Sequence, residues 1–442
     1  MKDSFKQYFT ELVGDVEAQS FFDAIDAKKT RRGIRVNTLK TTKKLLREWL
    51  EKNGYTVTDS PFSKDSLEIE GRGELWSLKL PYHAGFTYPQ DPSSTFVVDV
   101  LDPQPGETVI DMTAAPGGKT THIAQRMNNQ GVLFANDMDT RRLKALHSNL
   151  ERLGIWNAVV LRMNAHKLTL MYPEVFDRVL LDPSCSGEGL LNTHDGKPEF
   201  WSPKSLKHYS QDQFSLICSA FRLLKPGGRL VYSTCTLNAV EDDKVVEKLL
   251  KKFPQAEIIT DHPKHTPEQI GELKGIRFWP HKTNTKGFFC IAIGKKESLD
   301  LVPQEDTPRK VKTAANKKVR AVEVELEKLY GVTDFPWEWV ERDDFLFGVS
   351  KELTKFHLPF KHSLSFPIYK DGRLTHAAAL WVGLNSGKSL EVPGDELEAF
   401  FKEHRTSIQG DRKFELLKSG DFPLGIARKE GERMQPLLPR MF

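Results

Sequence analysis

Two of the four cysteines in this 442-residue chain stand where a thiol could act on a substrate. Cys185 follows the predicted strand FDRVLLD (176–182), and Cys235 ends the predicted strand GRLVYSTC (228–235). The carboxyl ends of parallel strands meet along one edge of a sheet, where open α/β folds bind their ligands. We therefore expect the two thiols to face the same cleft.

A thiol in such a cleft suits methylation of a pyrimidine at carbon 5. That carbon is too weakly nucleophilic to attack a methyl sulfonium unaided, and a thiolate that adds to carbon 6 makes it an enamine-like nucleophile. Asp182, which ends the strand before Cys185, could hydrogen-bond to N3 and the exocyclic amine of the ring. The base would have to be single-stranded or flipped out. Position alone does not say whether Cys185 or Cys235 adds, because DNA enzymes of related chemistry use the cysteine after a proline.

A run of small residues could bind the methyl donor. Residues 111–120 (DMTAAPGGKT) follow a predicted strand and open a helix, so a ligand can approach the backbone and place an anionic group at the helix N-terminus. The run matches neither G-x-G-x-x-G nor G-x-x-x-x-G-K-[ST]. Asp137 ends the next strand, where an acid can hold two ribose hydroxyls. Together they predict S-adenosylmethionine; a structural turn capped by aspartate and a dinucleotide site are the alternatives.

Short apolar strands alternate with helices between residues 81 and 297. This alternation is typical of a parallel sheet that helices cover on both faces. The predicted strands are ETVIDM (107–112), GVLFAND (131–137), AVVLRMN (158–164), FDRVLLD (176–182) and GRLVYSTC (228–235). The side chains at their ends are Asp111, Asp137, Asn164, Asp182 and Cys235.

The flanking segments differ from this core. Residues 1–80 join a helical opening to a strand–helix–strand pattern, and we expect a small α/β unit. Residues 298–320 contain prolines and basic residues and predict an exposed linker or the start of a basic helix. Residues 321–442 resume a globular composition, and strand-like runs such as HAAALWVGL (376–384) favour a mixed α/β or small β domain. The basic side chains that could follow phosphates are Arg309, Lys310, Lys312, Lys317, Lys318 and Arg320.

Composition excludes several classes of protein. Lys plus Arg (64) and Asp plus Glu (60) leave a net charge of +4, and 39% of the residues are hydrophobic, which does not fit a mostly disordered chain. No run approaches the roughly 18 apolar residues of a membrane span, and Asp3 and Glu11 interrupt any signal peptide. The cysteines form no CxxC pair, and Cys218 and Cys290 lie in apolar runs. We expect neither disulfides nor a metal site in a reduced, cytosolic protein.

A set of short motifs extends along the chain. They are RVNT (35–38), YPQDPSS (88–94), AAPGGKTT (114–121), Asp137, Asn164-Ala165, DPSCSGEG (182–189) and STCTLN (233–238). At these motifs the sequence resembles the Sun-type RNA cytosine-5 methyltransferases, the NSUN/Fmu family, over roughly residues 30–296. The resemblance implies a Rossmann-like class I methyltransferase core, S-adenosylmethionine as cofactor and RNA as partner. The residues that it implies for the cofactor loop are Thr113, Ala114, Ala115, Pro116, Gly117, Gly118 and Lys119.

The resemblance also assigns roles that position alone leaves open. It implies that Cys235 is the nucleophile and that Cys185 assists release of the methylated RNA. It implies that Asp182 lines both cofactor and base, that Asp137 holds the ribose, and that Asn164 contacts the adenine edge.

Two residues depart from the family's common pattern. Thr113 stands where many members have Cys, Ser or Gly, and we expect this position to act through its backbone. Asn164 replaces the commoner Asp, which keeps a hydrogen-bonding side chain and removes its charge. Neither change alters the expected activity.

The C-terminal region indicates which kind of RNA is the substrate. A catalytic core followed by a basic linker and residues 321–442, ending in FPLGIARKEGERMQPLLPRMF, looks like the ribosomal small-subunit methyltransferase F group, which appends a PUA-like RNA-binding module. This implies a monomer that forms 5-methylcytosine in 16S rRNA of the small ribosomal subunit. The same chemistry on transfer RNA is the first alternative, and a non-catalytic RNA-binding or assembly factor is the second. An NAD-dependent oxidoreductase is disfavoured because no G-x-G-x-x-G follows the first strand of the sheet.

Overall fold

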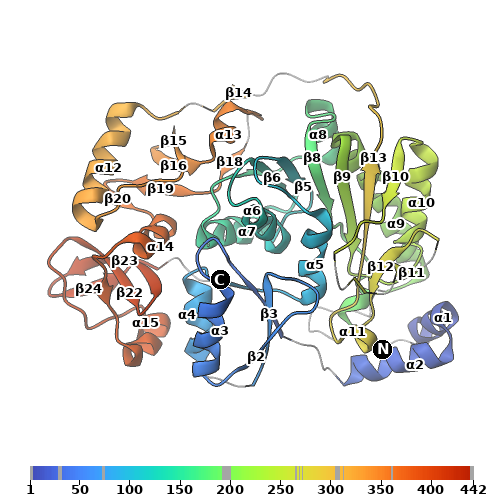
Figure 1. The fold of residues 1–442 in the computed structure, drawn as a ribbon, viewed down its shortest axis with the longest axis horizontal. Helices are drawn as coiled ribbons and strands as arrows, with labels where there is room; N and C mark the ends of the chain where they lie inside the picture. The colour runs from blue at the N-terminus through green and yellow to red at the C-terminus, as the bar shows by residue number, and fades with distance from the viewer. Residues whose placement is uncertain are drawn as a thin grey trace.

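The fold is known from a computed structural model, which describes residues 3–27, 32–71, 75–191, 201–263, 266–267, 269–270, 272–303, 309–311, 313–359 and 362–438. A central α/β core separates the C-terminal elements at one end from helices α1 (Asp3–Val13) and α2 (Asp15–Asp26) at the other (Figure 1). Within these ranges, no helix is both long and apolar enough to cross a bilayer.

A mixed sheet forms the centre of the molecule. Its parallel strands lie in the order β7-β6-β5-β8-β9, and β13 joins β9 in the antiparallel direction. The parallel strands confirm the sequence prediction, and β13 makes the sheet mixed. The bounds are Thr108–Asp111 (β5), Val132–Asn136 (β6), Ala158–Leu161 (β7), Phe176–Leu181 (β8), Leu224–Thr234 (β9) and Phe288–Lys295 (β13).

Helices cover both faces of this sheet, as the apolar strands require. Neighbouring side chains on a strand point to opposite faces, so Leu133 and Phe134 of β6 belong to different hydrophobic clusters. Helices α8, α9 and α10 pack on the face of Phe134, and α5, α6 and α7 pack on the face of Leu133. The bounds are Pro92–Leu101 (α5), Gly118–Arg126 (α6), Thr140–Leu153 (α7), Ala165–Met171 (α8), Pro203–Leu223 (α9) and Asp243–Lys252 (α10).

A smaller antiparallel sheet, in the order β2-β3-β1-β4, packs beside the core. Arg35 of β1 is only 1% exposed. Its guanidinium donates to Gln90 at 3.1 Å, Gln125 at 2.7 Å and Thr121 at 2.6 Å, which fixes this sheet to helix α6. The bounds are Arg32–Val36 (β1), Thr56–Asp59 (β2), Ser66–Glu70 (β3), Thr87–Pro89 (β4), Lys43–Lys52 (α3) and Leu75–His83 (α4).

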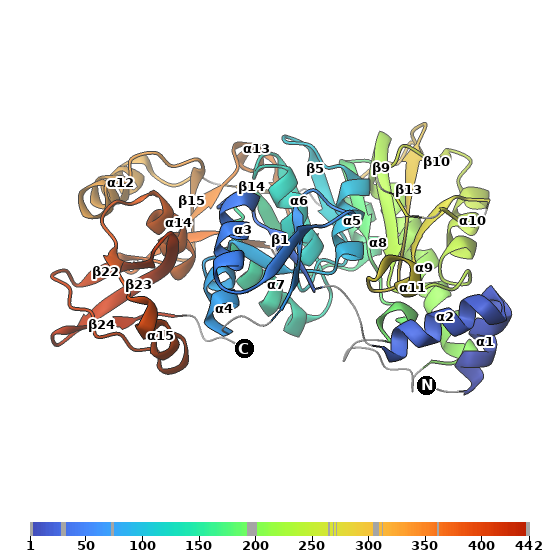
Figure 2. The ribbon, with the colours of Figure 1, turned by 60° about the horizontal axis from the view of Figure 1, so that its bottom comes forward.

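Helices α1 and α2 lie away from this small sheet, against the opposite end of the core (Figures 1 and 2). Phe5, Phe9 and Phe21 bury their rings with Trp201 and Trp279 of the core. The described parts of residues 1–80 therefore contact the core at two separate places.

The C-terminal region contains two further four-stranded sheets, in the orders β15-β16-β19-β20 and β21-β22-β23-β24. Helix α12 (Asn316–Tyr330) begins inside the segment 298–320 that the sequence predicts as a linker or helix start; Lys312 and residues 304–308 lie outside the described residues. Strand β18 (Ser363–Leu364) pairs with β7, so this region also extends the central sheet. The strand bounds are Glu338–Arg342 (β15), Phe345–Val349 (β16), Pro367–Lys370 (β19), Arg373–Leu374 (β20), Leu390–Glu391 (β21), Phe414–Ser419 (β22), Phe422–Glu430 (β23) and Arg433–Pro436 (β24).

One predicted strand of this region is wrong. The run HAAALWVGL forms helix α14 (His376–Asn385). A short continuous apolar run does not distinguish a strand from a buried helix, and alanine favours the helix. Thr375 caps it by accepting a hydrogen bond from the Ala378 amide at 3.2 Å, and Ala379 and Leu380 are fully buried.

A buried histidine joins the C-terminal region to the rest of the chain. The His83 ring at the end of α4 lies 3.0 Å from the Leu424 carbonyl of β23 and 5.3 Å from the His376 ring. Burial lowers the pKa of His83 to about 4, because the Leu424 carbonyl only partly offsets it and Arg152 and Lys40 lower it further. Both rings are therefore neutral when the regions are docked, because burial also lowers the pKa of His376.

This depressed pKa predicts that acid weakens the fold. Above pH 6.5 the His83 ring is neutral in the folded and unfolded chains, whereas between pH 6.5 and 4 only the unfolded chain takes up the proton. Titration of His83 should therefore lower the free energy of unfolding by about 1.4 kcal/mol per pH unit, or about 3 kcal/mol over the whole range from pH 6.5 to 4. His83→Gln keeps an N–H donor and removes the titration.

Denaturant unfolding of wild type and His83→Gln at pH 7.5 and 4.5 measures this difference. We expect wild type to lose about 2–3 kcal/mol more than the variant on acidification. Exposed His357→Gln is the matched control and should behave like wild type. Equal losses of unfolding free energy in wild type and His83→Gln would show that the titration of His83 does not weaken the fold in acid.

Candidate active site

The loop between β5 and α6 is held by a buried carboxylate. Asp111, 1% exposed, accepts hydrogen bonds from the Thr120 hydroxyl at 2.7 Å and the Thr113 amide at 3.4 Å. Burial raises its pKa to about 6. Gly117 turns the chain into α6 with φ of 107°, and a Cβ there would lie 3.0 Å from Leu146. The loop is therefore fixed with small residues along its exposed backbone.

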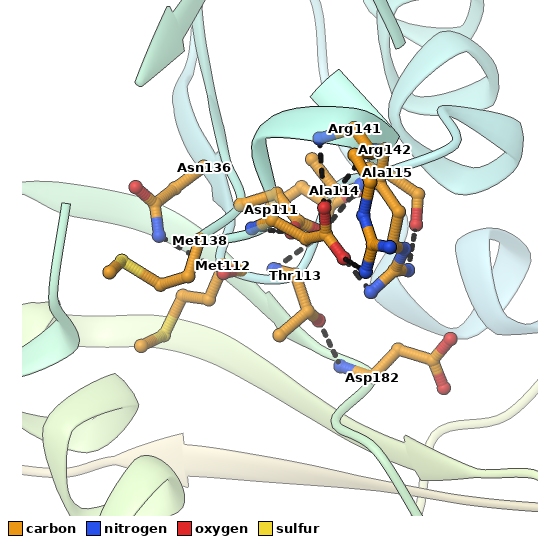
Figure 3. A network of polar contacts seen from close by, with 12 residues as sticks. Asp111, Met112, Thr113, Ala114, Ala115, Asn136, Met138, Arg141, Arg142 and Asp182 are labelled. Atoms are coloured by element: carbon orange, nitrogen blue, oxygen red, sulfur yellow. Dashed lines mark hydrogen bonds and ion pairs between the residues drawn. The ribbon is translucent and has the colours of Figure 1, made fainter. Parts of the chain in front are cut away.

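Asp137, directly after β6, supports the same loop from the side. Its carboxylate accepts hydrogen bonds from the Ala115 amide at 3.1 Å and the Asp139 amide at 2.9 Å. Arg142 pairs with it at 3.5 Å and donates to the Ala115 carbonyl, and Figure 3 shows Arg142 beside Ala115. The strand-end acid therefore shapes the loop that the sequence assigns to the cofactor.

Two more side chains lie at neighbouring strand ends. Met138 follows Asp137 and is 52% exposed, although it is large and apolar. Asn164 is exposed, and its side-chain oxygen accepts from the His166 amide at 2.8 Å, which caps helix α8. Sequence reasoning does not single out Met138; its signal is an apolar residue directly after the strand-end acid.

Asp182, at the end of β8, lies at the centre of a polar network. Its carboxylate accepts hydrogen bonds from the Lys119 ammonium at 2.6 Å and the Ser233 hydroxyl at 2.9 Å. Burial disfavours the charge of Lys119, but Asp182 outweighs this and raises the pKa of Lys119. The Lys119 ammonium also lies 5.0 Å from the centre of the Phe288 ring. Lys119, predicted only as part of the cofactor loop, therefore belongs to the charge pair at Asp182.

The Thr113 side chain makes a contact that the sequence does not predict. We expect this position to act through its backbone, but its hydroxyl accepts a hydrogen bond from the Asp182 amide at 3.1 Å (Figure 3). Cys or Gly at this position could not make the same bond as well, since sulfur is a weak acceptor and glycine has no side chain. The Thr113 side chain therefore ties the loop after β5 to the end of β8.

The two strand-end thiols do meet. The sulfur atoms of Cys185 and Cys235 lie 2.9 Å apart, and both side chains are half-buried. The hydrogen bond to Cys235 raises the pKa of Cys185 well above its ordinary value, and burial and the charges of Cys235 and Glu241 act in the same direction. Cys185 is therefore held as a thiol that can donate to the Cys235 sulfur. Cys218 and Cys290 are buried in the core, as predicted.

A cavity of about 300 Å³ connects the cofactor loop with one of the thiols. Cys235 lines it and Cys185 does not. Of the other predicted residues, Gly117, Asp137 and Asn164 also lie outside the lining. The predicted residues that do line it are Thr113, Ala114, Ala115, Pro116, Gly118, Lys119, Asp182 and Cys235. Tyr88 of the motif YPQDPSS also lines it, and the lining that the sequence did not single out includes Leu190, Lys286 and Phe288.

Two buried glutamates hold the loops that carry the thiols. Glu188, 1% exposed, accepts hydrogen bonds from the Thr236 hydroxyl at 2.8 Å and the Leu237 amide at 3.2 Å, both just after Cys235. Glu241, fully buried, accepts from the Ser186 amide at 3.0 Å, just after Cys185.

The same two loops are joined by further contacts. The Ser186 and Thr236 hydroxyls lie 3.0 Å apart. Gly189 donates to the Cys235 carbonyl at 2.9 Å, and a Cβ on Gly189 would lie 2.0 Å from the Gly287 carbonyl oxygen. A connected network of contacts therefore sets the spacing of the two thiols. Glu188, one member of this network, falls within the motif DPSCSGEG.

Substitution of Glu241 should loosen this network. The Glu241 carboxylate accepts hydrogen bonds from Ser186, Gln213 and Asn238, and a glutamine would turn an amide NH₂ toward at least one of these donors. We expect Glu241→Gln to lower the free energy of unfolding by about 1–3 kcal/mol. Iodoacetamide should also alkylate Cys185 faster, because a negative charge that raises the pKa of Cys185 is removed.

Denaturant unfolding and mass spectrometry of the alkylated peptides measure the two effects. Glu247→Gln, an exposed glutamate of α10, is the control and should change neither. If neither the free energy of unfolding nor the rate of Cys185 alkylation changes, Glu241 does not hold these loops together.

The site fits S-adenosylmethionine by its donors and shape. Small residues at Ala114 and Ala115 leave the loop backbone accessible, helix α6 begins at Gly118, and the exposed Met138 offers an apolar surface beside Asp137. The cavity falls within the range of about 300–1,000 Å³ that small-molecule sites occupy. The described residues contain no group of three or more His, Cys, Asp or Glu side chains that could hold a metal ion.

Known proteins match the chain in sequence and in structure. The family described as 16S rRNA methyltransferase RsmB/F matches residues 98–293. Ribosomal RNA small subunit methyltransferase F of Klebsiella pneumoniae (strain 342) is 32% identical over 95% of this chain and 92% of its own length. The Erwinia tasmaniensis protein of the same name is 30% identical over 99% of this chain and 95% of its own length.

Two solved structures share the fold over two thirds of the chain. A methyltransferase homolog protein from Pyrococcus horikoshii has 32% identity and a TM-score of 0.59, covering 67% of this chain and 95% of its own. NSun6 from Pyrococcus horikoshii with SFG, an analogue of S-adenosylmethionine, has 26% identity and a TM-score of 0.60, covering 67% of this chain and 99% of its own. They support the Rossmann-like methyltransferase core that the sequence predicts. The chain therefore belongs to the ribosomal RNA small subunit methyltransferase F family of S-adenosylmethionine-dependent RNA methyltransferases.

Proposed function

We propose that this protein forms 5-methylcytosine in 16S rRNA of the small ribosomal subunit, through a covalent bond between Cys235 and carbon 6 of the target base. The observation that carries the proposal is the pair of thiols 2.9 Å apart, one of them in the same cavity as the cofactor loop and the Asp182–Lys119 pair. The relatives named ribosomal RNA small subunit methyltransferase F support the choice of RNA.

Residues of three strand ends would hold the cofactor. The backbone of 113–119 would approach the amino-acid tail at the N-terminus of α6, where amides favour a negative group. Asp137 would hold the ribose, and Met138 would pack against the adenine, whose edge Asn164 would contact once it leaves its capping bond. The bound cofactor supplies an electrophilic methyl group.

Cys235 is the better placed nucleophile, because it lines the cavity and Cys185 lies behind it. The Cys185 thiol, held protonated, can donate a hydrogen bond to the Cys235 sulfur. The thiolate form of a cysteine is the nucleophile. The thiolate adds to carbon 6, and the ring's electrons shift to carbon 5 and to the N3 side. Lys119 and Asp182 stand at the cavity wall, where Asp182 would accept a hydrogen bond from the exocyclic amine and the Lys119 ammonium would balance the negative charge that develops on the ring.

Cys185 would act in the second half of the reaction. Once the Cys235 sulfur is bonded to carbon 6, its negative charge no longer raises the pKa of Cys185. Cys185 can then lose its own proton to solvent and, as a thiolate, accept the proton of carbon 5. The electron pair left on carbon 5 re-forms the ring double bond and expels Cys235 as a thiolate, which frees the methylated RNA.

The flanking regions would bind the surrounding RNA. We assign residues 1–80 to an N-terminal RNA-binding unit, 81–297 to the catalytic domain, 298–320 to a basic linker and 321–442 to a PUA-like RNA-binding region. The protein would act as a monomer that accepts one extruded cytosine. The basic character of Lys317, Lys318 and Arg320 at the start of α12 supports RNA contact there.

Transfer of tritium from labelled S-adenosylmethionine tests the proposal. Purified small subunits, large subunits, deproteinised small-subunit rRNA and bulk transfer RNA serve as substrates, followed by nucleoside analysis. We expect label in 5-methylcytosine from small-subunit rRNA. Label in transfer RNA alone would overturn the substrate, and no label in any 5-methylcytosine would overturn the chemistry.

A further inference from the structure

A second cavity lies in the C-terminal region, far from the two thiols. It measures about 370 Å³ and opens between α12, the β19–β20 turn and the start of β22. Figures 1 and 2 both place α12 and β22 at the end of the molecule opposite α10. No residue of the methylation site lines it.

One part of the cavity wall is an aromatic ring with two cations near it. Phe414 is half-buried, whereas Arg373 and Lys413 are exposed. The Lys413 ammonium lies 5.5 Å from the centre of the Phe414 ring, and the Arg373 guanidinium lies 6.0 Å from it. An aromatic ring with two exposed cations close to it suits a flat aromatic ligand that carries negative charge.

Another part of the cavity wall offers acceptors for hydrogen bonds. Tyr369 donates its hydroxyl to Glu325 at 2.5 Å, which fixes the position of this carboxylate, and Asp371 is exposed at the β19–β20 turn. A carboxylate accepts about four hydrogen bonds, so Glu325 keeps capacity beyond the one from Tyr369. Such a wall favours a ligand with N–H donors.

An ion pair stiffens a further part of the lining. Arg412 donates to the Leu329 and Lys388 carbonyls and pairs with Glu415, which is 2% exposed. Its charge is thus already balanced, so Arg373 and Lys413 are the lining cations whose charges face a ligand. The cavity does not depend on a ligand to order this part of its lining.

We propose that this cavity binds one unpaired nucleotide of the RNA substrate. This inference rests on the proposed function and adds a contact with the RNA far from the two thiols. The base stacks on Phe414, its exocyclic amine donates to Glu325 or Asp371, and its phosphate pairs with Arg373 and Lys413. Unpaired bases are the part of folded RNA that proteins recognise through aromatic stacking and base edges. A base with an exocyclic amine fits better than uracil, which offers no amine.

The test uses the full chain, with deproteinised small-subunit rRNA and intact small subunits as substrates. We expect Phe414→Leu and Arg373→Ala each to raise KM roughly tenfold, the size of one lost stacking or phosphate contact, with kcat unchanged. Filter binding should show the same rise in Kd for the naked rRNA. Phe414→Tyr should keep wild-type values, and thermal unfolding checks that each variant is folded.

Two control variants separate the cavity from general surface effects. Phe345→Leu removes another half-buried ring beside a cation, Lys370 at 4.2 Å, and Arg405→Ala removes an exposed cation, both outside the cavity. Unchanged KM and Kd in Phe414→Leu and Arg373→Ala, or equal changes in the controls, would overturn the inference. If the variants weaken binding to intact subunits and not to naked rRNA, the cavity contacts a ribosomal protein, and this result would also overturn the inference. Absence of wild-type methylation would instead count against the proposed function.

Discussion

Cys235→Ala should abolish methyl transfer while leaving the affinity for S-adenosylmethionine within about twofold of wild type. Without a sulfur at this position no bond to carbon 6 forms, and carbon 5 stays too weak a nucleophile to accept the methyl group. We expect a loss of roughly 10⁴-fold or more in kcat, since the remaining groups act mainly by binding. The cofactor loop is held by Asp111 and Asp137 rather than by the thiol, so binding should survive.

Tritium transfer and calorimetric titration with S-adenosylmethionine measure the two quantities. Cys218→Ala, which removes a buried thiol from α9 outside the cavity, is the matched control and should keep its turnover. Measurable turnover by Cys235→Ala would show that the nucleophile is elsewhere. A parallel loss of cofactor affinity would show that the thiol shapes the cofactor site.

The central part of the fold follows from the sequence because its signals are local. Apolar runs ending in a polar or thiol side chain give the strands β5, β6, β7, β8 and β9, and their common direction brings the ends together. The meeting of Cys185 and Cys235 at one edge of the sheet is therefore predictable from strand order and direction. The 2.9 Å between their sulfurs also depends on the loop contacts of Glu188 and Glu241.

Other features depend on contacts between distant segments and were not predictable in the same way. The hydroxyl of Thr113 finds the Asp182 amide only when β5 and β8 are neighbours, and Lys119 finds the carboxylate for the same reason. The run 376–384 forms a helix that buries five of its residues, and its apolar residues lie on every side, so the sequence lacks the periodicity that would distinguish a helix from a strand. Helices α1 and α2 give no local sign of which end of the core they cover.

Cys185→Ala should trap the enzyme on its RNA. Cys235 can still add to carbon 6, and the methyl group can still transfer, because neither step needs the second sulfur. Removal of the carbon 5 proton and expulsion of Cys235 should slow, so a covalent protein–RNA adduct should accumulate. We expect a band that survives denaturing electrophoresis, carries the tritium label and disappears on nuclease treatment, while multiple turnover falls roughly 100-fold or more, the range of a lost general base.

The double variant Cys185→Ala/Cys235→Ala gives the control, because the adduct needs the Cys235 sulfur and should vanish with it. The thiols lie 2.9 Å apart, so loss of Cys185 also removes the hydrogen bond to Cys235, and the initial adduct should form more slowly as well. An adduct in Cys235→Ala and none in Cys185→Ala would exchange the two roles. Free product at the wild-type rate from Cys185→Ala would mean that a group other than Cys185 takes the carbon 5 proton.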